Sequence, residues 1–270
     1  MGAVTKEQIT SAFQKLGICP GDTVLIHSSL RSFGGLENGA QTVIDGVESL
    51  LGPEGTLVLP TLCQQDFRNS YRTWHLDKPS DVGWLTEYFR HLPGVLRSDQ
   101  ATHSVAARGK LARELTFEHT AYGPHLCPFG EYAFADSSPW NKLLKADAHI
   151  VFAGVDLTYN TMKHLIEGRF AETLLSRIGD LSRRTELQAQ LMTFETFERG
   201  LWPFYSGPKM GEALDKAGLV THAECGNARL LRVSAKDSSE FALHALLTAP
   251  EEWFSGKMLD WIRNAQASAE

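Results

Sequence analysis

Residues 21–34 read "GDTVLIHSSLRSFG", and this stretch decides the fold. A turn at Gly21-Asp22 leads into the apolar run 24–26, and polar side chains follow directly at 27–29. This is the pattern of a buried strand that ends at a polar edge. Residues 37–51 then predict a helix, and "TLVLPT" at 56–61 predicts a second apolar strand. Strand, helix and strand in close succession indicate a βαβ unit, and therefore a parallel sheet covered by helices.

The same alternation continues along the chain. Helices are predicted at 5–17, 83–92, 110–119 and 138–146, and "AHIVFAGV" at 148–155 predicts a third buried strand, which a helix follows from about residue 161. In the C-terminal third we predict a pair of strands at 186–197, a helix at 209–219, a strand with a bend at 225–237, and a last helix at 239–249 before a polar tail.

No internal repeat, low-complexity tract or linker-like segment marks a domain boundary. We therefore expect residues 1–270 to form a single α/β domain. Its central sheet is predicted to be mixed but largely parallel, with helices on both faces.

Composition narrows the class of protein. The chain has 270 residues with 43% hydrophobic content, enough for a full core. No run approaches the 18 apolar residues of a membrane span, and the N-terminus lacks the pattern of a signal peptide, so we expect no membrane association and a cytoplasmic location. The formal charge of −6 argues against a nucleic-acid partner. Four widely spaced cysteines favour free thiols in a reducing compartment.

Polar residues gather at three predicted strand ends. They are residues 27–29, residues 102–104 in "ATHSVAARG", and residues 156–167 after the third strand. Because ligands of open α/β sheets bind at the carboxyl ends of the strands, each of these ends is a candidate. Serine and threonine at such places are more often helix caps, but three ends that converge on one edge favour a functional site.

The segment "TMKHLIE" at 161–167 carries the most specific pair. His164 and Glu167 are three residues apart and therefore lie on one face of a helix. This spacing fits a metal site, a base with the carboxylate that orients it, or a polar helix face. A third metal ligand is not visible at local spacing, so we expect no metal. The signatures of serine-hydrolase elbows, nucleotide phosphate loops and H-E-x-x-H zinc sites are absent. The position after a buried strand favours the base.

An ordered set of segments resembles the aminoglycoside 3-N-acetyltransferase family, also described as antibiotic N-acetyltransferases. The segments are "GDTVLIHSSLRSFG", "GPEGTLVLPT", "GWLTEYFRHLPGVLRSDQATHSVAARG", "SSPWNKL", "FAGVDLTYNTMKHLIEGRF" and "GNARLLRVSAKD". The resemblance implies an α/β fold particular to that family and unlike the GCN-type acetyltransferase fold. It also implies acetyl-CoA as co-substrate. The implied acceptor is the 3-amino group of the 2-deoxystreptamine ring of aminoglycoside antibiotics, whose modification confers resistance.

The resemblance also assigns roles to residues. His164 takes the place of the catalytic histidine in the family's "NT-x-x-H-x-x-E" motif and is expected to act as general base for direct attack of the amine on the thioester. Glu195 is expected to orient it, with Glu198 and Glu167 as rivals. Glu167 and Asp66 are expected to meet the cationic substrate. The remaining implied residues would contact coenzyme A, and they are His27, Ser28, Ser29, Leu30, His103 and Ser104.

Two other functions fit the same residues. The acceptor of an acyl-CoA N-acyltransferase can be a different amine, such as a biosynthetic intermediate. Alternatively, the chain binds coenzyme A or an antibiotic without catalysing a reaction.

Overall fold

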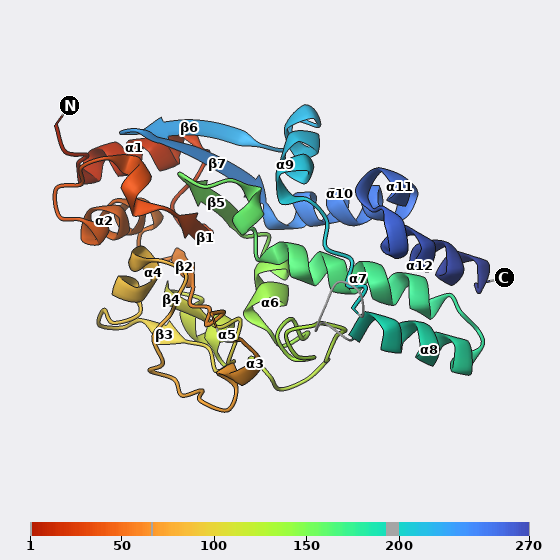
Figure 1. Ribbon diagram of the computed structural model, residues 1–270. Coiled ribbons are helices and arrows are strands. Elements are labelled where there is room, and N and C mark those ends of the chain that lie inside the picture. The colour runs from red at the N-terminus through yellow and green to blue at the C-terminus, as the bar shows by residue number, and fades with distance from the viewer. Residues whose placement is uncertain (1, 66, 193–199, 270) are drawn as a thin grey trace.

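The computed structural model describes residues 2–65, 67–192 and 200–269. A seven-stranded sheet in the order β3-β4-β2-β1-β5-β7-β6 runs through the molecule (Figure 1). In chain order the strands are β1 (Thr23–Ser28), β2 (Thr56–Pro60), β3 (Leu96–Arg97), β4 (Val105–Gly109), β5 (His149–Ala153), β6 (Thr221–Cys225) and β7 (Ala228–Ser234).

Helices surround the sheet, and they alternate with strands in the first part of the chain. They are α1 (Lys6–Lys15), η1 (Leu30–Phe33), α2 (Ala40–Leu51), α3 (Phe67–Ser70), α4 (Trp84–Phe89), α5 (Ala112–Thr116), α6 (Pro139–Lys145), η2 (Leu157–Tyr159), α7 (Met162–Ser176), α8 (Leu181–Met192), α9 (Gly207–Lys216), α10 (Ala235–Thr248), α11 (Pro250–Trp253) and α12 (Gly256–Ala267). None of these described helices has the length and apolarity that crossing a bilayer requires.

The sheet is mixed, as predicted, but its parallel part is confined to the centre. Strand β1 pairs in parallel with β2 on one side and β5 on the other. The outer strands β4, β3, β7 and β6 are antiparallel to their neighbours. The prediction of a largely parallel sheet was therefore wrong. Strands β6 and β7 are joined by only Gly226 and Asn227, and so short a connection forces an antiparallel pair.

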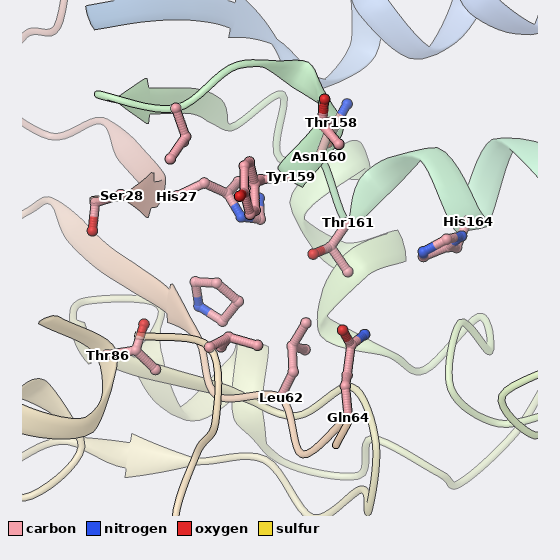
Figure 2. A pocket seen from close by; sticks show the side chains of 13 residues that line it. His27, Ser28, Leu62, Gln64, Thr86, Thr158, Tyr159, Asn160, Thr161 and His164 are labelled. Carbon is pink, nitrogen blue, oxygen red and sulfur yellow. The ribbon is translucent and has the colours of Figure 1, made fainter. Parts of the chain in front are cut away.

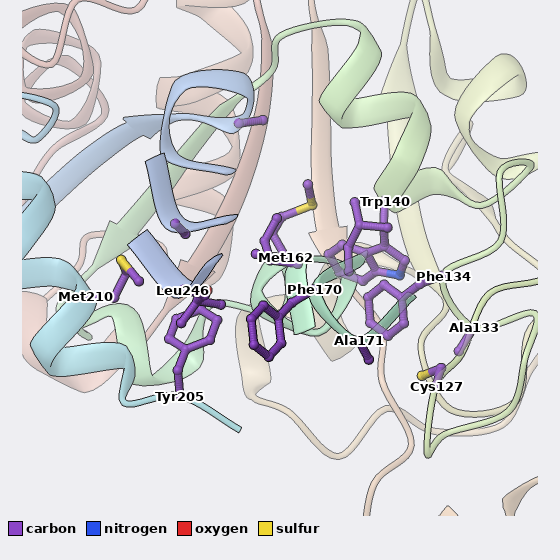
Figure 3. Close-up of a cluster of buried hydrophobic side chains, with 14 of the residues drawn as sticks. Cys127, Ala133, Phe134, Trp140, Met162, Phe170, Ala171, Tyr205, Met210 and Leu246 are labelled. Carbon is purple, nitrogen blue, oxygen red and sulfur yellow. The ribbon is translucent and has the colours of Figure 1, made fainter. Parts of the chain in front are cut away.

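Helices cover both faces, as predicted, and two hydrophobic cores result. Along β1, Val24 and Ile26 face the core formed with α1, α2 and α4. Leu25 points to the opposite face, where α5, α6, α7, α8 and α10 pack. This alternation follows from the period of two along a strand. Figure 3 shows part of the second core, with Phe170 of α7 and Trp140 of α6 among its buried rings.

Two predictions for the C-terminal third were wrong. Residues 186–192 lie in helix α8 instead of a strand, and residues 193–197 of that predicted pair fall outside the described residues. Leu187 and Leu191, the two buried residues of α8, are four apart, which is a helical spacing. The predicted polar tail forms α11 and α12, and Trp261 and Ile262 of α12 are buried in the main core.

The polar segments predicted from the sequence do meet at one edge of the sheet. Strand β1 ends at Ser28, and β5 leads through η2 into α7 at the same edge. Residues 102–104 come before β4 rather than after a strand. Because β4 is antiparallel to β2, with Val105 opposite Pro60, its first residue lies beside the carboxyl end of β2. The sheet edge at which these segments meet was therefore predicted correctly. The direction of β4 was not, because residues 102–104 precede β4 instead of following a strand.

Candidate active site

A cavity of about 170 Å³ opens at this edge of the sheet (Figure 2). Its walls come from the ends of β1 and β2, the start of α4, and the segment that joins β5 to α7. The lining residues are His27, Ser28, Pro60, Leu62, Gln64, Val82, Thr86, Val155, Thr158, Tyr159, Asn160, Thr161 and His164. The cavity therefore brings together two of the three predicted polar strand ends.

His164 lies in the first turn of α7 and is held by Glu167 of the next turn. Its Nδ1 is 2.7 Å from Oε2 of Glu167. When Glu167 is ionised, its carboxylate only accepts hydrogen bonds, so Nδ1 carries the hydrogen and donates it, and Nε2 keeps a lone pair. The His164 side chain is 15% exposed and lines the cavity. Figure 2 shows its ring directed toward the space between Thr161 and Gln64.

Glu167 is completely buried beneath the histidine. Its second oxygen, Oε1, accepts a hydrogen bond from the main-chain N–H of Tyr205 at 3.2 Å. Both carboxylate oxygens are thus engaged inside the protein. The expected contact between Glu167 and a cationic substrate is not what the structure shows, because no part of this carboxylate reaches the surface.

Burial shifts the pKa values of His164 and Glu167 in opposite directions. It lowers the pKa of His164, and the neighbouring ammonium of Lys163 lowers it further. Burial raises the pKa of Glu167 to about 8, although Lys163 and the Tyr205 N–H both oppose that increase. The histidine is therefore neutral near pH 7. With Nδ1 fixed by Glu167, Nε2 faces the cavity with a free lone pair, which is the geometry that a general base needs, although burial lowers its basicity.

His103 and Ser104 lie behind the cavity rather than in contact with a ligand, since both are fully buried. His103 Nδ1 is 2.9 Å from the hydroxyl of Thr102, and the Ser104 hydroxyl bonds to Thr61. The expected phosphate contacts of His103 and Ser104 are therefore not what the structure shows. The ring of His103 instead packs edge-on against His164, with centroids 5.9 Å apart.

Aromatic rings surround the rest of His164. Phe129, Phe134 and Phe204 have ring centroids 4.9, 5.9 and 5.7 Å from that of the histidine. These rings fix the plane of the imidazole and keep water from its sides. These rings could not be predicted from the sequence, because Phe129 and Phe204 belong to irregular segments whose place depends on tertiary packing.

The end of β1 supplies the opposite wall. His27 is 5% exposed, its ring stacks on Phe152 at 5.4 Å, and burial lowers its pKa to about 3. Its Nε2 has no hydrogen-bond partner among the described residues. Ser28 lines the cavity, whereas Ser29 and Leu30 lie just beyond it, at the start of η1. Of the four expected contact residues at this strand end, two face the cavity.

The loop before α7 contributes residues that the sequence analysis did not single out. Thr158, Asn160 and Thr161 line the cavity, and the side chain of Asn160 accepts a hydrogen bond from the N–H of Met162 at 3.1 Å. Thr161 is the N-cap residue of α7, but its hydroxyl makes no capping bond. The positive end of a 15-residue helix therefore lies beside the cavity. The signal in the sequence was "TYNT", which directly follows a buried strand.

Three of the predicted site residues, Asp66, Glu195 and Glu198, lie outside the described residues. Within the described part of the chain, Glu167 is the carboxylate that lies within hydrogen-bond distance of His164. In that same part, no group of three histidine, cysteine, aspartate or glutamate side chains converges as metal ligands would.

Comparison with known proteins agrees with the fold and with the predicted resemblance. The family model described as aminoglycoside 3-N-acetyltransferase matches residues 25–247. The SPbeta prophage-derived aminoglycoside N(3')-acetyltransferase-like protein YokD of Bacillus subtilis (strain 168) is 24% identical, over 93% of this chain and 92% of its own. The solved apoenzyme of aminoglycoside acetyltransferase AAC(3)-IVa superposes with a TM-score of 0.71 at 22% identity, over 98% and 99% of the two chains. A binary complex of AAC-IIIb with CoASH gives 0.71 at 18%, over 95% and 100%.

Proposed function

Because the chain belongs to the aminoglycoside 3-N-acetyltransferase family, we propose that it transfers the acetyl group of acetyl-CoA to the 3-amino group of the 2-deoxystreptamine ring of aminoglycosides, and so confers resistance to them. The observation that carries this proposal is the placement of His164. Its Nδ1 is held by a buried carboxylate while the ring faces the cavity.

In the proposed reaction, the amine nitrogen attacks the carbonyl carbon of the acetyl thioester. His164 Nε2 accepts the proton that the amine loses, and Glu167 stabilises the imidazolium that forms. The carbon–sulfur bond then breaks, and the coenzyme A thiolate takes up that proton. The products are an N-acetylated amine and free coenzyme A.

Glu167 is the carboxylate that we assign to this role. It already accepts the Nδ1–H of His164 at 2.7 Å, and its burial makes that hydrogen bond strong. Glu195, which the sequence comparison favoured, lies outside the described residues and stays a prediction.

The cavity suits the pantetheine arm of acetyl-CoA. Hydroxyl groups of Ser28, Thr158 and Thr161 and the amide groups of Gln64 and Asn160 line it, and they can pair with the amides of such an arm. The unpartnered Nε2 of His27 is one more polar atom available at this wall. The complex of the similar AAC-IIIb with CoASH supports the same choice of co-substrate. We place the reaction in the cytoplasm, where the four free cysteines stay reduced.

One observation favours a second acceptor class. Among the described residues that line the cavity, none is an aspartate or glutamate. A polycationic aminoglycoside is best bound by carboxylates, so the alternative is an N-acyltransferase acting on a less charged amine.

The test is a panel of amines assayed with acetyl-CoA. Thiol release would be followed for several aminoglycosides and for monoamines of similar size, with mass spectrometry of each product. An aminoglycoside carrying one new acetyl group on its 3-amino nitrogen supports the leading proposal. Acetylation of monoamines alone supports the alternative, and no acetylated amine in any reaction would contradict both.

A further inference from the structure

A second charged residue of α7 contacts the carboxylate that holds His164. The Nζ atom of Lys163 lies 3.9 Å from Oε1 of Glu167, one helical turn away. It also donates a hydrogen bond to the carbonyl oxygen of Tyr205 at 3.3 Å. The side chain is only 15% exposed, and Nζ lies 5.9 Å and 5.7 Å from the ring centroids of Phe204 and Tyr205. This ammonium is therefore fixed against the carboxylate rather than free in solvent.

The groups that face Glu167 come from three parts of the fold. Lys163 and His164 belong to α7 itself. Tyr205, from the segment before α9, offers its N–H, and its buried phenol has a pKa raised by burial and by the Glu167 charge. Cys127, from the segment between α5 and α6, is a buried thiol whose pKa burial raises beyond the physiological range. Figure 3 labels Tyr205 and Cys127 among the buried side chains.

Near neutral pH these neighbours differ in charge. The thiol and the phenol are uncharged because burial raises both of their pKa values, and the histidine is neutral because burial lowers its pKa. Lys163 is thus the cation that faces Glu167 among the described residues. His103, the other titratable group packed on His164, is likewise kept neutral by burial.

We propose that Lys163 is a positioning residue that favours the ionised form of Glu167, in which His164 carries its hydrogen on Nδ1 and leaves Nε2 free to accept a proton. This inference rests on the proposed role of His164 as the general base. The reason is one of hydrogen-bond direction. A protonated Glu167 would donate to Nδ1, the remaining imidazole hydrogen would move to Nε2, and the base would be lost. A fixed ammonium close to the carboxylate opposes that protonation.

The three residues contact one another in sequence along helix α7. Lys163 and Glu167 are an i, i+4 pair, and His164 and Glu167 are an i, i+3 pair. All three side chains therefore lie on neighbouring positions of the same helix face. The carboxylate is bonded at Oε2 by the histidine, while Lys163 and the Tyr205 N–H both approach Oε1. Replacement of Lys163 by an uncharged residue would leave the hydrogen bond from the Tyr205 N–H to Oε1 of Glu167 but would remove the positive charge beside that oxygen.

The test compares K163M, which keeps the length of the side chain without the charge, with K163R, which keeps the charge. K209M is the matched control, since Lys209 of α9 also lies over an aromatic ring, that of Trp253 at 4.8 Å, but its Nζ bonds to the carbonyl oxygen of Glu252 instead of facing Glu167. The first measurement is a pH titration of the free protein labelled with 15N-histidine. The His164 signals are identified by their loss in H164Q.

We expect the protonation midpoint of the His164–Glu167 pair to rise by about one to three pH units in K163M, because a nearby cation lowers a carboxylate pKa by that much. The Nε2–H tautomer should therefore appear at higher pH than in the wild type. K163R and K209M should titrate like the wild type. A K163M midpoint equal to that of the wild type would overturn the proposal, and this titration needs no turnover.

The second measurement is the pH profile of kcat/KM. In K163M the acidic limb should move to higher pH by the same number of units, so that activity lost on that limb returns at higher pH. A merely structural lysine would instead lower activity equally at every pH, and that outcome would contradict the proposal. If no amine is acetylated by the wild type, the proposed function fails. The titration of the free protein still decides the role of Lys163.

Discussion

Replacement of Glu167 by glutamine tests the centre of the site with a minimal change in shape. The amide oxygen of the introduced side chain can still accept the N–H of Tyr205, as Oε1 does now at 3.2 Å. The amide NH2 then faces Nδ1 of His164 in place of the carboxylate oxygen that lies 2.7 Å away. Because that NH2 can only donate, Nδ1 must become the acceptor, and the imidazole hydrogen moves to Nε2.

The size of the effect follows from burial. Removing one partner of a buried ion pair costs about 3–5 kcal/mol, and here the pair is fully formed only when His164 becomes charged in the transition state. At 1.36 kcal/mol for each tenfold change, this corresponds to a loss of roughly 150- to 5,000-fold in kcat. The expected drop lies in kcat rather than in the KM for acetyl-CoA, since Glu167 is fully buried and does not line the cavity.

The assay is steady-state thiol release at saturating acetyl-CoA, with thermal unfolding of each variant as the control for folding. E172Q is the matched variant. Glu172 is on the same helix and pairs with Nδ1 of His125 at 2.9 Å, but it is not part of the cavity lining. Because Glu172 bonds to His125 and to the Leu126 N–H rather than to His164, E172Q should stay within about threefold of wild-type activity once folding is accounted for.

A folded E167Q protein that keeps kcat within threefold of the wild type would refute this reasoning. So would equal losses in E167Q and E172Q, because the effect would then not depend on contact with His164.

Two further predictions concern stability. Burial lowers the pKa of His119 to about 4, so its protonation favours the unfolded state, in which the pKa is 6.5. Stability should fall as the pH drops from 6.5 toward 4, and His119 should contribute about 2 kcal/mol of that loss by pH 5. Urea unfolding at pH 7 and pH 5 should show a smaller loss in H119Q, and equal losses would contradict the assignment. Gly154 has a φ of +71°, and an added Cβ would lie 1.6 Å from Oγ of Ser32, whereas Gly39 has a φ of +57° and open space. G154A should therefore unfold at a clearly lower urea concentration than G39A. Equal unfolding midpoints would show that the Ser32 side chain can move away from the added methyl group without loss of stability.

The sequence predicted the centre of the fold better than its edges. Strands β1, β2 and β5 are continuous apolar runs because they are buried on both faces, and such runs are distinct in a sequence. The C-terminal third was less predictable. Helix α8 buries only Leu187 and Leu191 and exposes Leu181 and Met192, so the helical spacing of its apolar residues was hard to distinguish from a strand pattern. The "CGNA" turn between β6 and β7 carried a hairpin signal that was not recognised.

The candidate site shows a similar division. His164 could be predicted because it follows a buried strand and begins a helix, and both features are local. The i, i+3 spacing also pointed to Glu167 as its partner, although the sequence comparison favoured Glu195. Whether His103 and Ser104 are exposed could not be predicted, because their burial depends on β4 pairing antiparallel to β2. The rings around His164 come from segments without regular structure, and their approach depends on the whole core.

The most direct measurement of the central claim is a single-turnover reaction with enzyme in excess over acetyl-CoA, comparing wild type with H164Q. The amine would be an acceptor identified by the panel assay, and acetyl-CoA affinity would be measured in parallel. If His164 is the base, the first-order rate of amine acetylation should fall by about 100-fold or more in H164Q, while acetyl-CoA binds as before. Equal single-turnover rates in two folded proteins would show that His164 does not accept the proton of the amine.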